Sequence, residues 1–362
     1  MRISRSEILK SKKVLIIDSD LKINNDRTWC FWEKEKNYFE NLLHKEWKQA
    51  EFIDEFGKID LTLHPYSYKM IRGIDFYEYC IRELKNNANV TFLHSEVLEI
   101  KKMKSPQVIT SSGTFHGDLI FDSTKPIFKE NKNYHTLWQH FKGIIVETEE
   151  DCFNDDKATL MDFTIDQQGD CRFFYVLPIN QRKALIEYTI FNESVFNSQS
   201  EYDKELMPYI HDKLKNRKFT LKEKEIGVIP MSNAPVSETN FKEHIKIGTA
   251  GGLTKASSGY TFKFIQNDSE RILKQIENGI IPDQFKAKGK FMLYDAVLLH
   301  ILKNKKMKAS QVFSDLFRKN NCVDVFTFLN NESSLTQDLM IMSSVKKSVF
   351  IPAAFVEIFR NI

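Results

Sequence analysis

The chain has 362 residues, of which 42% are hydrophobic and 28% are charged, with only 13 glycines and 9 prolines. This length corresponds to about two domains with a sizeable core, and the composition excludes disordered, collagen-like and repeat-array proteins. The 52 basic and 49 acidic residues give a net charge of +3 without a strongly basic field, so we expect no nucleic-acid partner. Aromatic residues make up 12% of the chain, which suits a hydrocarbon-like ligand as well as an ordinary core.

The cellular compartment follows from the cysteines and from the apolar runs. The cysteines are odd in number, far apart and without a CxxC pair, which is typical of reduced thiols in a cytoplasmic protein. The basic N-terminus lacks the apolar run of a secretory signal, and no stretch approaches the roughly 20 apolar residues that cross a bilayer. We therefore expect a cytoplasmic protein without a transmembrane helix.

The first elements of the chain resemble part of a nucleotide-binding unit. Residues 1–11 are expected to form the end of a helix, and residues 14–18 form a continuous aliphatic run that ends in Asp18, as a buried parallel strand does. In dinucleotide-binding units such an acid binds the ribose about 20 residues after a glycine-rich turn. Here the first glycine is Gly57, so the phosphate-binding turn is missing from the sequence.

Further along the chain, the pattern predicts a second α/β unit, then a β-rich layer, then helices. Apolar spacing predicts a helix over 74–84 and a strand over 90–93. A charged helix is expected around 203–217, and a strand at 245–248 leads into a glycine turn and a helix over 260–276. From about 283 onward only helices are expected. The strands predicted for the β-rich layer are 97–100, 119–121, 144–147, 159–163, 172–177 and 184–190.

Several unusual sequence words occur in a fixed order between residues 14 and about 265. The first is NNDRTWCFWE at 24–33, and the longest is GTAGGLTKASSGYTF at 248–262. The words between them stand at 68–77, 121–123, 138–143, 160–163, 174–178, 184–189 and 229–231. Together they resemble the bacterial lycopene β-cyclase family.

The resemblance implies a fold, a cofactor and a reaction. Members of that family are flavoproteins that fold the linear ψ-ends of lycopene into β-ionone rings, a net isomerisation that needs reduced FAD, with NAD(P)H as electron donor. The implied fold class is α/β. It comprises a Rossmann-like FAD-binding domain over 1–130 and 236–280 without its first strand and glycine-rich turn, a β-rich substrate domain over 131–235, and a helical cap over 281–362. Another FAD-dependent isoprenoid oxidoreductase on the same scaffold, or an inactive fragment, remains an alternative.

Glu187 is the expected catalytic acid. An alkene is a poor base, so its protonation needs a well-placed acid in a dry site. Glu187 lies in a largely apolar predicted strand, where burial would keep it protonated, and the resemblance places a catalytic acid at this position. An outward-facing glutamate on a half-exposed strand is the alternative. Many family members carry a second acid directly after this one, whereas this chain has Tyr188.

Asp162 is the second catalytic candidate, able to orient Glu187 or to assist proton removal if their two strands are neighbours; a structural hydrogen bond is the alternative. A developing cation could be stabilised by aromatic faces, although core packing is the commoner role of such side chains. The candidate lining residues are Trp29, Phe31, Trp32, Phe174 and Tyr175.

For the cofactor, the resemblance and the fingerprint of acid and glycines together assign FAD contacts. The glycine turn would let the backbone approach FAD, and the helix that follows would point its amides at the cofactor. No metal is expected, because His135 and His140 have no partners at metal-ligand spacing. The cofactor-binding candidates are Asp18, Arg27, Gly248, Ala250, Gly251 and Gly252.

The resemblance also implies lycopene and related carotenoids as partners, and with them a membrane surface. Phe350, Phe355 and Phe359, close to basic residues, could place the last helix in the interface of the inner membrane as a peripheral element, although ordinary helix packing explains the same pattern. No protein partner is expected. Because family members begin with the strand and GxGxxG turn, we expect this sequence to be incomplete at its front and, as given, to bind FAD weakly.

Overall fold

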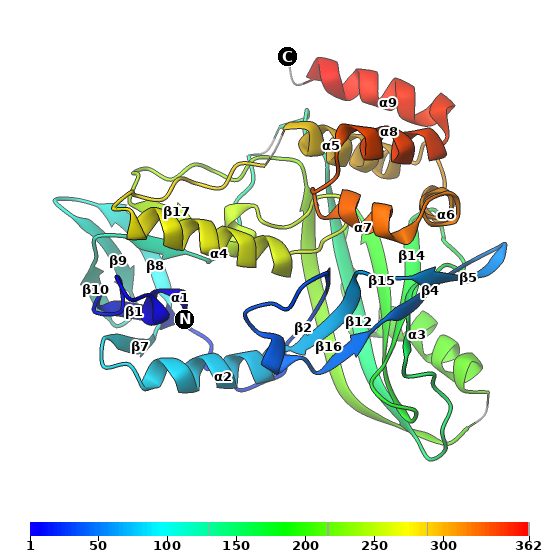
Figure 1. The fold of residues 1–362 in the computed structure, drawn as a ribbon, viewed down its shortest axis with the longest axis horizontal. Coiled ribbons are helices and arrows are strands. Elements are labelled where there is room, and N and C mark those ends of the chain that lie inside the picture. The colour runs from blue at the N-terminus through cyan, green and yellow to red at the C-terminus, as the bar shows by residue number, and fades with distance from the viewer. Residues whose placement is uncertain (130, 216, 288, 361–362) are drawn as a thin grey trace.

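A large mixed sheet is the centre of the computed structural model, which describes residues 1–129, 131–215, 217–287 and 289–360 (Figure 1). Its order within these residues is β16-β12-β15-β14-β13-β4-β5. The predicted strands at 144–147, 159–163, 172–177 and 184–190 are confirmed, and the first and last of them are longer than expected. The strands are β4 (Gln49–Asp54), β5 (Gly57–Thr62), β12 (Thr136–Thr148), β13 (Lys157–Asp162), β14 (Cys171–Pro178), β15 (Lys183–Asn192) and β16 (Phe219–Ser232).

This sheet draws strands from both sides of the expected domain boundary at residue 130, which itself lies outside the described residues. β4 pairs parallel with β13 and antiparallel with β5, so residues 49–62 extend the sheet that was predicted to begin after 130. The sequence pattern did not indicate these two strands or β16. The parallel pairing joins segments more than 100 residues apart, and such a contact leaves no periodic signal in either segment.

Both faces of the large sheet are covered, and the strand sequences show why. Every residue of β14 is buried, as a strand between two layers requires. One face packs against α3 (Gln199–Leu214), whose residues Tyr202, Leu206, Ile210 and Leu214 form a stripe at four-residue spacing. The helix predicted around 203–217 is thus confirmed, and it ends at Lys215, which adopts a left-handed backbone conformation.

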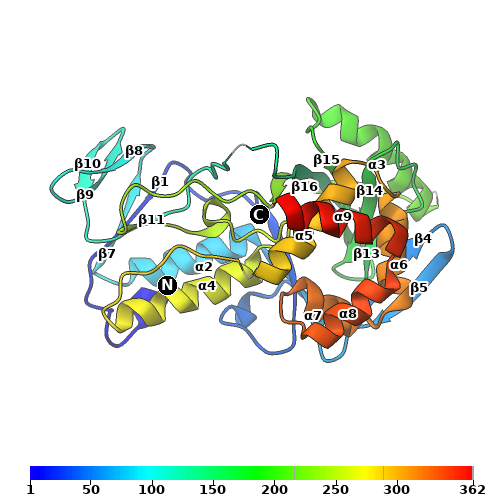
Figure 2. The same cartoon turned by 90° about the horizontal axis from the view of Figure 1, so that it is seen from above.

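The other face is covered by the C-terminal helices, seen above the sheet in Figures 1 and 2. These helices and the sheet share one core, in which Phe313 and Phe317 pack against Phe52 and Phe163. In the described part of the chain no strand follows β17, so the predicted helical cap is confirmed. None of its helices combines the length and apolarity that a bilayer span needs, within the described residues. The helices are α5 (Gly289–Lys303), α6 (Ala309–Lys319), α7 (Cys322–Leu329), α8 (Leu335–Ser344) and α9 (Lys347–Arg360).

A smaller α/β unit lies to one side of the large sheet (Figure 1). β1 (Val14–Asp18) pairs parallel with β7 (Val90–His94), and β11 (Ile120–Asp122) pairs parallel with β17 (His244–Lys246). The predicted helices are present as α2 (Gly73–Lys85) and α4 (Phe262–Glu277). At the N-terminus only α1 (Arg2–Arg5) is helical, so the helix expected over 1–11 is wrong beyond its first turn.

Two antiparallel three-stranded sheets complete the fold. One contains β8 (Val97–Lys102), β9 (Pro106–Thr110) and β10 (Gly113–His116). The other has the order β2-β6-β3, with β2 (Thr28–Glu33), β6 (Ser67–Arg72) and β3 (Lys45–Trp47). β2 carries most of the unusual word at 24–33. Its residues alternate between two faces, and this alternation positions the site described below.

A buried charged cluster joins α9 to the rest of the cap. Glu357 Oε1 lies 2.9 Å from His135 Nε2 and 2.7 Å from His300 Nδ1, and Arg360 Nη1 lies 3.2 Å from the same oxygen. The side chains of His135, His300 and Glu357 have the ligand types and spacing of a metal site, although they come from distant parts of the chain. Arg360 Nη1 also lies 2.9 Å from His135 Nε2, so a cation already sits beside the cluster, and we assign it a structural role.

We predict that Glu357→Gln destabilises the protein, because it leaves Arg360 without its buried counter-charge. The expected loss is about 3 kcal/mol in the free energy of unfolding, measured by urea denaturation. Glu238→Gln is the control, since Glu238 is exposed and pairs only at the surface with Lys129. Equal stability of the Glu357 variant and the parent would contradict the structural role.

Candidate functional site

Four positions form a row across the large sheet, on the face that carries β2. Tyr175 on β14 stands opposite Glu187 on β15, Glu187 stands opposite Gly143 on β12, and Gly143 stands opposite Glu225 on β16. Residues opposite one another in antiparallel strands point to the same face, so both glutamates project from one side of the sheet. They are separated only by a residue without a side chain.

Each glutamate accepts a short hydrogen bond from a threonine. Thr189 Oγ1 donates to Glu187 Oε1 and Thr28 Oγ1 donates to Glu225 Oε2, both at 2.6 Å. Among the described residues, neither carboxyl has an ion pair or hydrogen bond with a lysine, arginine or histidine. Glu225 is buried, and protein surrounds the carboxyl of Glu187 although that residue keeps some accessible surface.

The pKa values of both carboxyls are raised by this environment. Burial and then repulsion from Glu225 raise the pKa of Glu187 well above its ordinary value. Burial also raises the pKa of Glu225, against the opposing effects of its hydrogen bonds with Thr28 and Glu187. Two like charges in a buried site are costly, so this environment favours retention of a proton by the pair.

Strand β2, which carries most of the sequence word at 24–33, lies beside the carboxyl pair. Its alternate residues Thr28, Cys30 and Trp32 face the site: Thr28 binds Glu225, and Trp32 lines the cavity described next. Cys30 lies close enough that burial, followed by the charges of Glu225 and Glu187, raises the pKa of its thiol well above the ordinary value. The residues between these three pack on the other side of the strand.

A tyrosine cluster links the carboxyl pair to the loop after the glycine turn. The hydroxyl of Tyr260 lies 3.2 Å from that of Tyr68 and 3.5 Å from that of Tyr175. Gly259, with φ at +74°, is required here because an added Cβ would meet Gln139 Oε1 on β12 at 2.1 Å. This close approach fixes the loop against the sheet next to Glu187.

An apolar cavity of about 590 Å³ lies between this row and the C-terminal helices. Trp32, Tyr175 and Tyr260 form its wall near the glutamates, and the Trp32 ring contacts Tyr260 edge-on with ring centres 4.3 Å apart. Leu339 on α8 and Ile351 on α9 line the cavity and are 65% and 51% exposed, so the cavity reaches the surface between these helices. The remaining apolar lining comes largely from α5 to α9.

The predicted aromatic residues are divided among three places. Trp32 and Tyr175 line the cavity. Trp29 and Phe31 pack instead around Phe262 at the start of α4, with ring centres 5.8 Å and 4.4 Å from it. Phe174 faces α3 and stacks on Tyr209, because it neighbours Tyr175 in the strand and so points to the opposite face.

Asp162 does not meet the condition for orienting Glu187. β14 lies between the strands of Asp162 and Glu187, and Asp162 stands opposite Phe174, which places it on the α3 side. Its carboxylate accepts hydrogen bonds from Tyr209 at 2.7 Å and from Thr164 at 2.6 Å. The structural hydrogen-bonding role, considered as an alternative, is the one that the geometry supports.

The predicted cofactor residues lie in the smaller unit. Asp18 ends β1, where its carboxylate accepts a hydrogen bond from the Asp20 backbone and lies 3.3 Å from Lys22 Nζ. Arg27 lies just before β2, and its guanidinium pairs with Asp26 at 2.6 Å. The side chains of neither residue contact the carboxyl pair in any recorded hydrogen bond or ion pair of the described chain.

The glycine turn follows β17 as a short 3₁₀ helix at Gly248–Gly251. Gly248 and Gly252 have φ values of +61° and +78°, and a Cβ at Gly248 would meet nothing nearer than Ile265 at 3.9 Å, so its backbone is open to a ligand. The side chain of Ala250 is buried. The helix predicted over 260–276 is α4, which begins at Phe262, so a loop separates it from the glycines. Open backbone and an acid at the carboxyl ends of parallel strands nevertheless fit a bound nucleotide.

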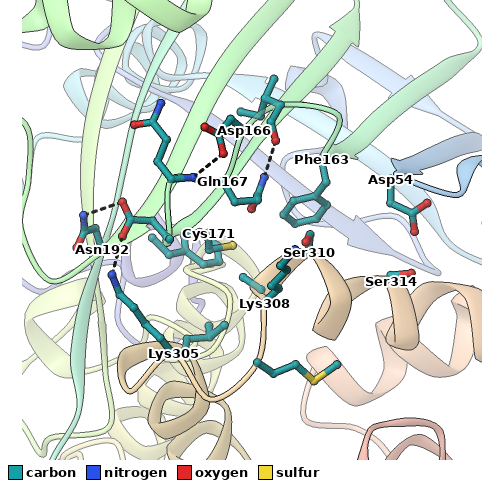
Figure 3. Close-up of a pocket in the computed structure, with 18 of the residues that line it drawn as sticks. Asp54, Phe163, Asp166, Gln167, Cys171, Asn192, Lys305, Lys308, Ser310 and Ser314 are labelled. Atoms are coloured by element: carbon teal, nitrogen blue, oxygen red, sulfur yellow. Dashed lines mark hydrogen bonds and ion pairs between the residues drawn. The ribbon is translucent and has the colours of Figure 1, made fainter.

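A second cavity, of about 790 Å³, is polar (Figure 3). It lies between the loop after β13 and the segment joining α5 to α6, and several of its charged groups form ion pairs. Lys305 Nζ lies 3.6 Å from Asp170, Lys303 lies 3.1 Å from Glu193, and Asp54 pairs with Arg318. We assign it no chemistry.

Glu225 is the functional candidate that sequence reasoning missed. It lies in the charged run KEKEIG, in which its neighbours on β16 are exposed. Only its register opposite Gly143 brings it to Glu187. The sequence carries no signal of that register.

Comparison with known proteins identifies a family and a fold. The family described as "Lycopene cyclase protein" matches residues 4–353. No curated protein matches the chain in sequence. A geranylgeranyl bacteriochlorophyll reductase-like protein from Thermoplasma acidophilum superimposes with a TM-score of 0.55 at 11% identity, covering 96% of this chain and 89% of that protein.

Two further solved structures share the architecture. A flavin-dependent brominase has a TM-score of 0.54 at 11% identity, with 96% of this chain and 92% of that chain covered. A flavoprotein/dehydrogenase from Cytophaga hutchinsonii has a TM-score of 0.53 at 11% identity, with 88% and 84% covered. At such low identity the likeness concerns the fold alone, and it confirms the expected α/β class with a large sheet and C-terminal helices.

We predict that Glu187→Gln changes the dependence of stability on pH. A carboxyl whose pKa is raised on folding holds a proton that the unfolded chain releases, so above pH 4.5 it lowers stability by up to about 1.4 kcal/mol per pH unit. The variant should therefore lose less stability than the parent as pH rises from 5 to 8, measured by urea denaturation. Glu147→Gln, an exposed position on β12, should keep the parent slope, and identical slopes for all three proteins would contradict the buried acid.

Proposed function

Because the chain belongs to the lycopene cyclase protein family, we propose that it converts the linear ψ-ends of lycopene into β-ionone rings, with Glu187 as the acid. The observation that carries the proposal is the pair of carboxyls beside an apolar cavity with aromatic walls. Among the described residues, neither carboxyl forms an ion pair with a cation. Lycopene offers neither charge nor hydrogen-bonding groups, so an apolar cavity suits it and a polar one does not.

The environment of Glu187 matches the first step of such a reaction. Protonation of an alkene requires an acid that keeps its proton at neutral pH and a site from which water is excluded. Burial and the neighbouring Glu225 keep the proton on Glu187, while Thr189 fixes one carboxyl oxygen. The proton passes from Glu187 to the alkene, ring closure leaves a carbocation, and loss of another proton from carbon restores the starting balance. The product therefore has the mass of the substrate.

Aromatic side chains would stabilise the cation. The faces of Trp32, Tyr175 and Tyr260 border the cavity closest to the carboxyl pair, and aromatic quadrupoles attract a cation. The cavity reaches the surface between α8 and α9, so one end of a long hydrocarbon lies near Glu187 while the rest extends outward. The site therefore binds one end of the substrate at a time.

FAD in its reduced form, with NAD(P)H as the electron donor, belongs to the same proposal. When bound, reduced flavin supplies an electron-rich ring without net transfer of electrons to the substrate. Asp18 would bind the ribose, and the open backbone at Gly248 and Gly252 would allow close approach of the cofactor, with Arg27 as a further contact. The loop from Gly252 to Tyr260 joins these glycines to the tyrosine cluster beside Glu187.

We predict that Glu187→Gln abolishes cyclisation. When the chain is expressed in a lycopene-accumulating bacterium, the parent should yield a cyclic carotene of unchanged mass, and the variant should yield at least 100-fold less, since general acid catalysis contributes about 10²–10⁴-fold. Glu147→Gln, an exposed position on β12, is the control. Pigments are separated by chromatography and weighed by mass spectrometry, and a product that has gained hydrogen or oxygen would indicate an isoprenoid reductase or hydroxylase instead.

We also propose that α8 and α9 place the protein on the cytoplasmic face of the inner membrane as a peripheral element. Phe355 and Phe359 are 58% and 70% exposed, and Leu335, Leu339 and Met340 extend the apolar surface on α8. The acids of these two helices, Asp338 and Glu357, are buried, whereas Lys346 and Lys347 are exposed between them. An apolar surface bordered by basic groups complements an anionic lipid surface, and the cavity opens on the same side.

We predict that the double variant Phe355→Ser/Phe359→Ser binds vesicles at least tenfold more weakly, because each buried phenylalanine contributes about 1.5 kcal/mol or more. Binding is measured by co-sedimentation with phosphatidylglycerol vesicles. Phe56→Ser on the β4–β5 hairpin is the control, since Phe56 is also 70% exposed. Unchanged binding of the double variant would show that these helices do not contact lipid.

A further inference from the structure

Glycine is favoured at position 143 because there is little room for a side chain, and not because of its backbone conformation. Its φ is outside the left-handed region that favours glycine, yet an added Cβ would lie 3.0 Å from both Glu225 Cγ and Leu185 Cδ1. It would also lie 3.3 Å from Glu225 Oε1. The glycine therefore leaves the room through which the Glu225 side chain extends across β12 toward Glu187.

Each threonine binds one oxygen of its carboxyl. The second oxygen of each carboxyl is therefore available to the neighbouring carboxyl. Thr28 binds Oε2 of Glu225, so the oxygen above Gly143 is the Oε1 that this threonine does not bind. Thr189 binds Oε1 of Glu187. A hydrogen bond between the two glutamates contributes to the pKa values of both carboxyls. Such a bond requires a proton on one of them, since two carboxylates only accept.

The titratable groups whose charge acts most directly on the pair are acids. Cys30 on β2, Tyr175 on β14 and Tyr260 on the loop before α4 lie beside it, and the hydroxyl of Tyr68 on β6 lies 3.2 Å from that of Tyr260. The basic side chains of His44, Arg72 and Lys224 line a small pocket together with Glu225, but among the described residues none forms an ion pair or hydrogen bond with either glutamate. Asp26 and Glu223 add negative charge from the side of Glu225. With no cation among the recorded partners of the described chain, one proton between the carboxyls is what relieves their repulsion.

We propose that Glu187 and Glu225 share one proton across Gly143, which makes Glu225 a positioning residue that holds the proton of Glu187. The use of this proton in cyclisation rests on the proposed function, whereas the sharing does not. When Glu187 gives its proton to the alkene, the pair carries two negative charges. The proton lost by the cyclised cation then returns to the pair, so that no proton is gained or lost in a turnover.

The test measures the shared proton directly in the full chain without substrate. Infrared difference spectroscopy during a pH titration follows the band of a protonated carboxylic acid, whose assignment is checked by its loss in Glu187→Gln. In Glu225→Gln, removal of the neighbouring negative charge should lower the pH midpoint of this band by at least one unit, a tenfold change in the proton-binding constant. Glu147→Gln, an exposed position on β12 that pairs with Lys222, should leave the midpoint unchanged.

Other results would overturn the sharing. An unshifted midpoint in Glu225→Gln would overturn it, as would the absence of a protonated carboxyl in the parent at pH 7. Gly143→Ala should lower the midpoint in the same direction, because its Cβ displaces Glu225; the glutamine variant decides the question if this protein does not fold. In lycopene-accumulating cell extracts, the upper pH limit of conversion should fall with the midpoint in Glu225→Gln, which a purely structural role would not cause. A shifted band in a chain that never converts lycopene would reject the proposed function and leave the shared proton standing.

Discussion

Two carboxyls lie close together on one face of a sheet, with no ion pair to a cation among the described residues, and they impose the main constraint on this structure. Their repulsion is tolerable only if the pair retains a proton, and the proton is retained only while water is kept away. β2 provides Thr28 for one carboxyl and, with β6, covers the pair. The site thus depends on contacts among strands that are far apart in the sequence.

The rest of the fold follows from the need for an apolar and enclosed space beside this pair. The large sheet presents the face opposite α3 to the C-terminal helices, and the cavity lies between those helices and the side chains of Tyr175 and Trp32. The buried cluster of Glu357, His135 and His300 holds α9 in place, so the last helix can expose an apolar outer surface without leaving the cap. Enclosure near the acid and an opening at the surface are therefore provided by the same helices.

One loop of the smaller α/β unit reaches the acid site. Gly248 and Gly252 open the backbone after β17, and eight residues after Gly252 the hydroxyl of Tyr260 lies within hydrogen-bonding reach of the tyrosines beside Glu187. Gly259 allows this loop to approach β12 so closely that a side chain would collide with Gln139. The glycine turn proposed to bind the nucleotide and the buried acid, which belong to different sheets, are in this way held in a fixed relation.

The sequence by itself determined the α/β class, the parallel strand ending in Asp18, the central strands of the large sheet, the helical cap, and Glu187 as an acid in an apolar strand. Those features depend on local periodicity and composition, which are visible in a single segment. Only the tertiary structure decided that Glu225 joins Glu187, that Asp162 faces α3 instead, and that β4 and β5 extend the sheet. Each of these depends on which strands pair and in which register, and a shift of one residue would turn every side chain to the opposite face.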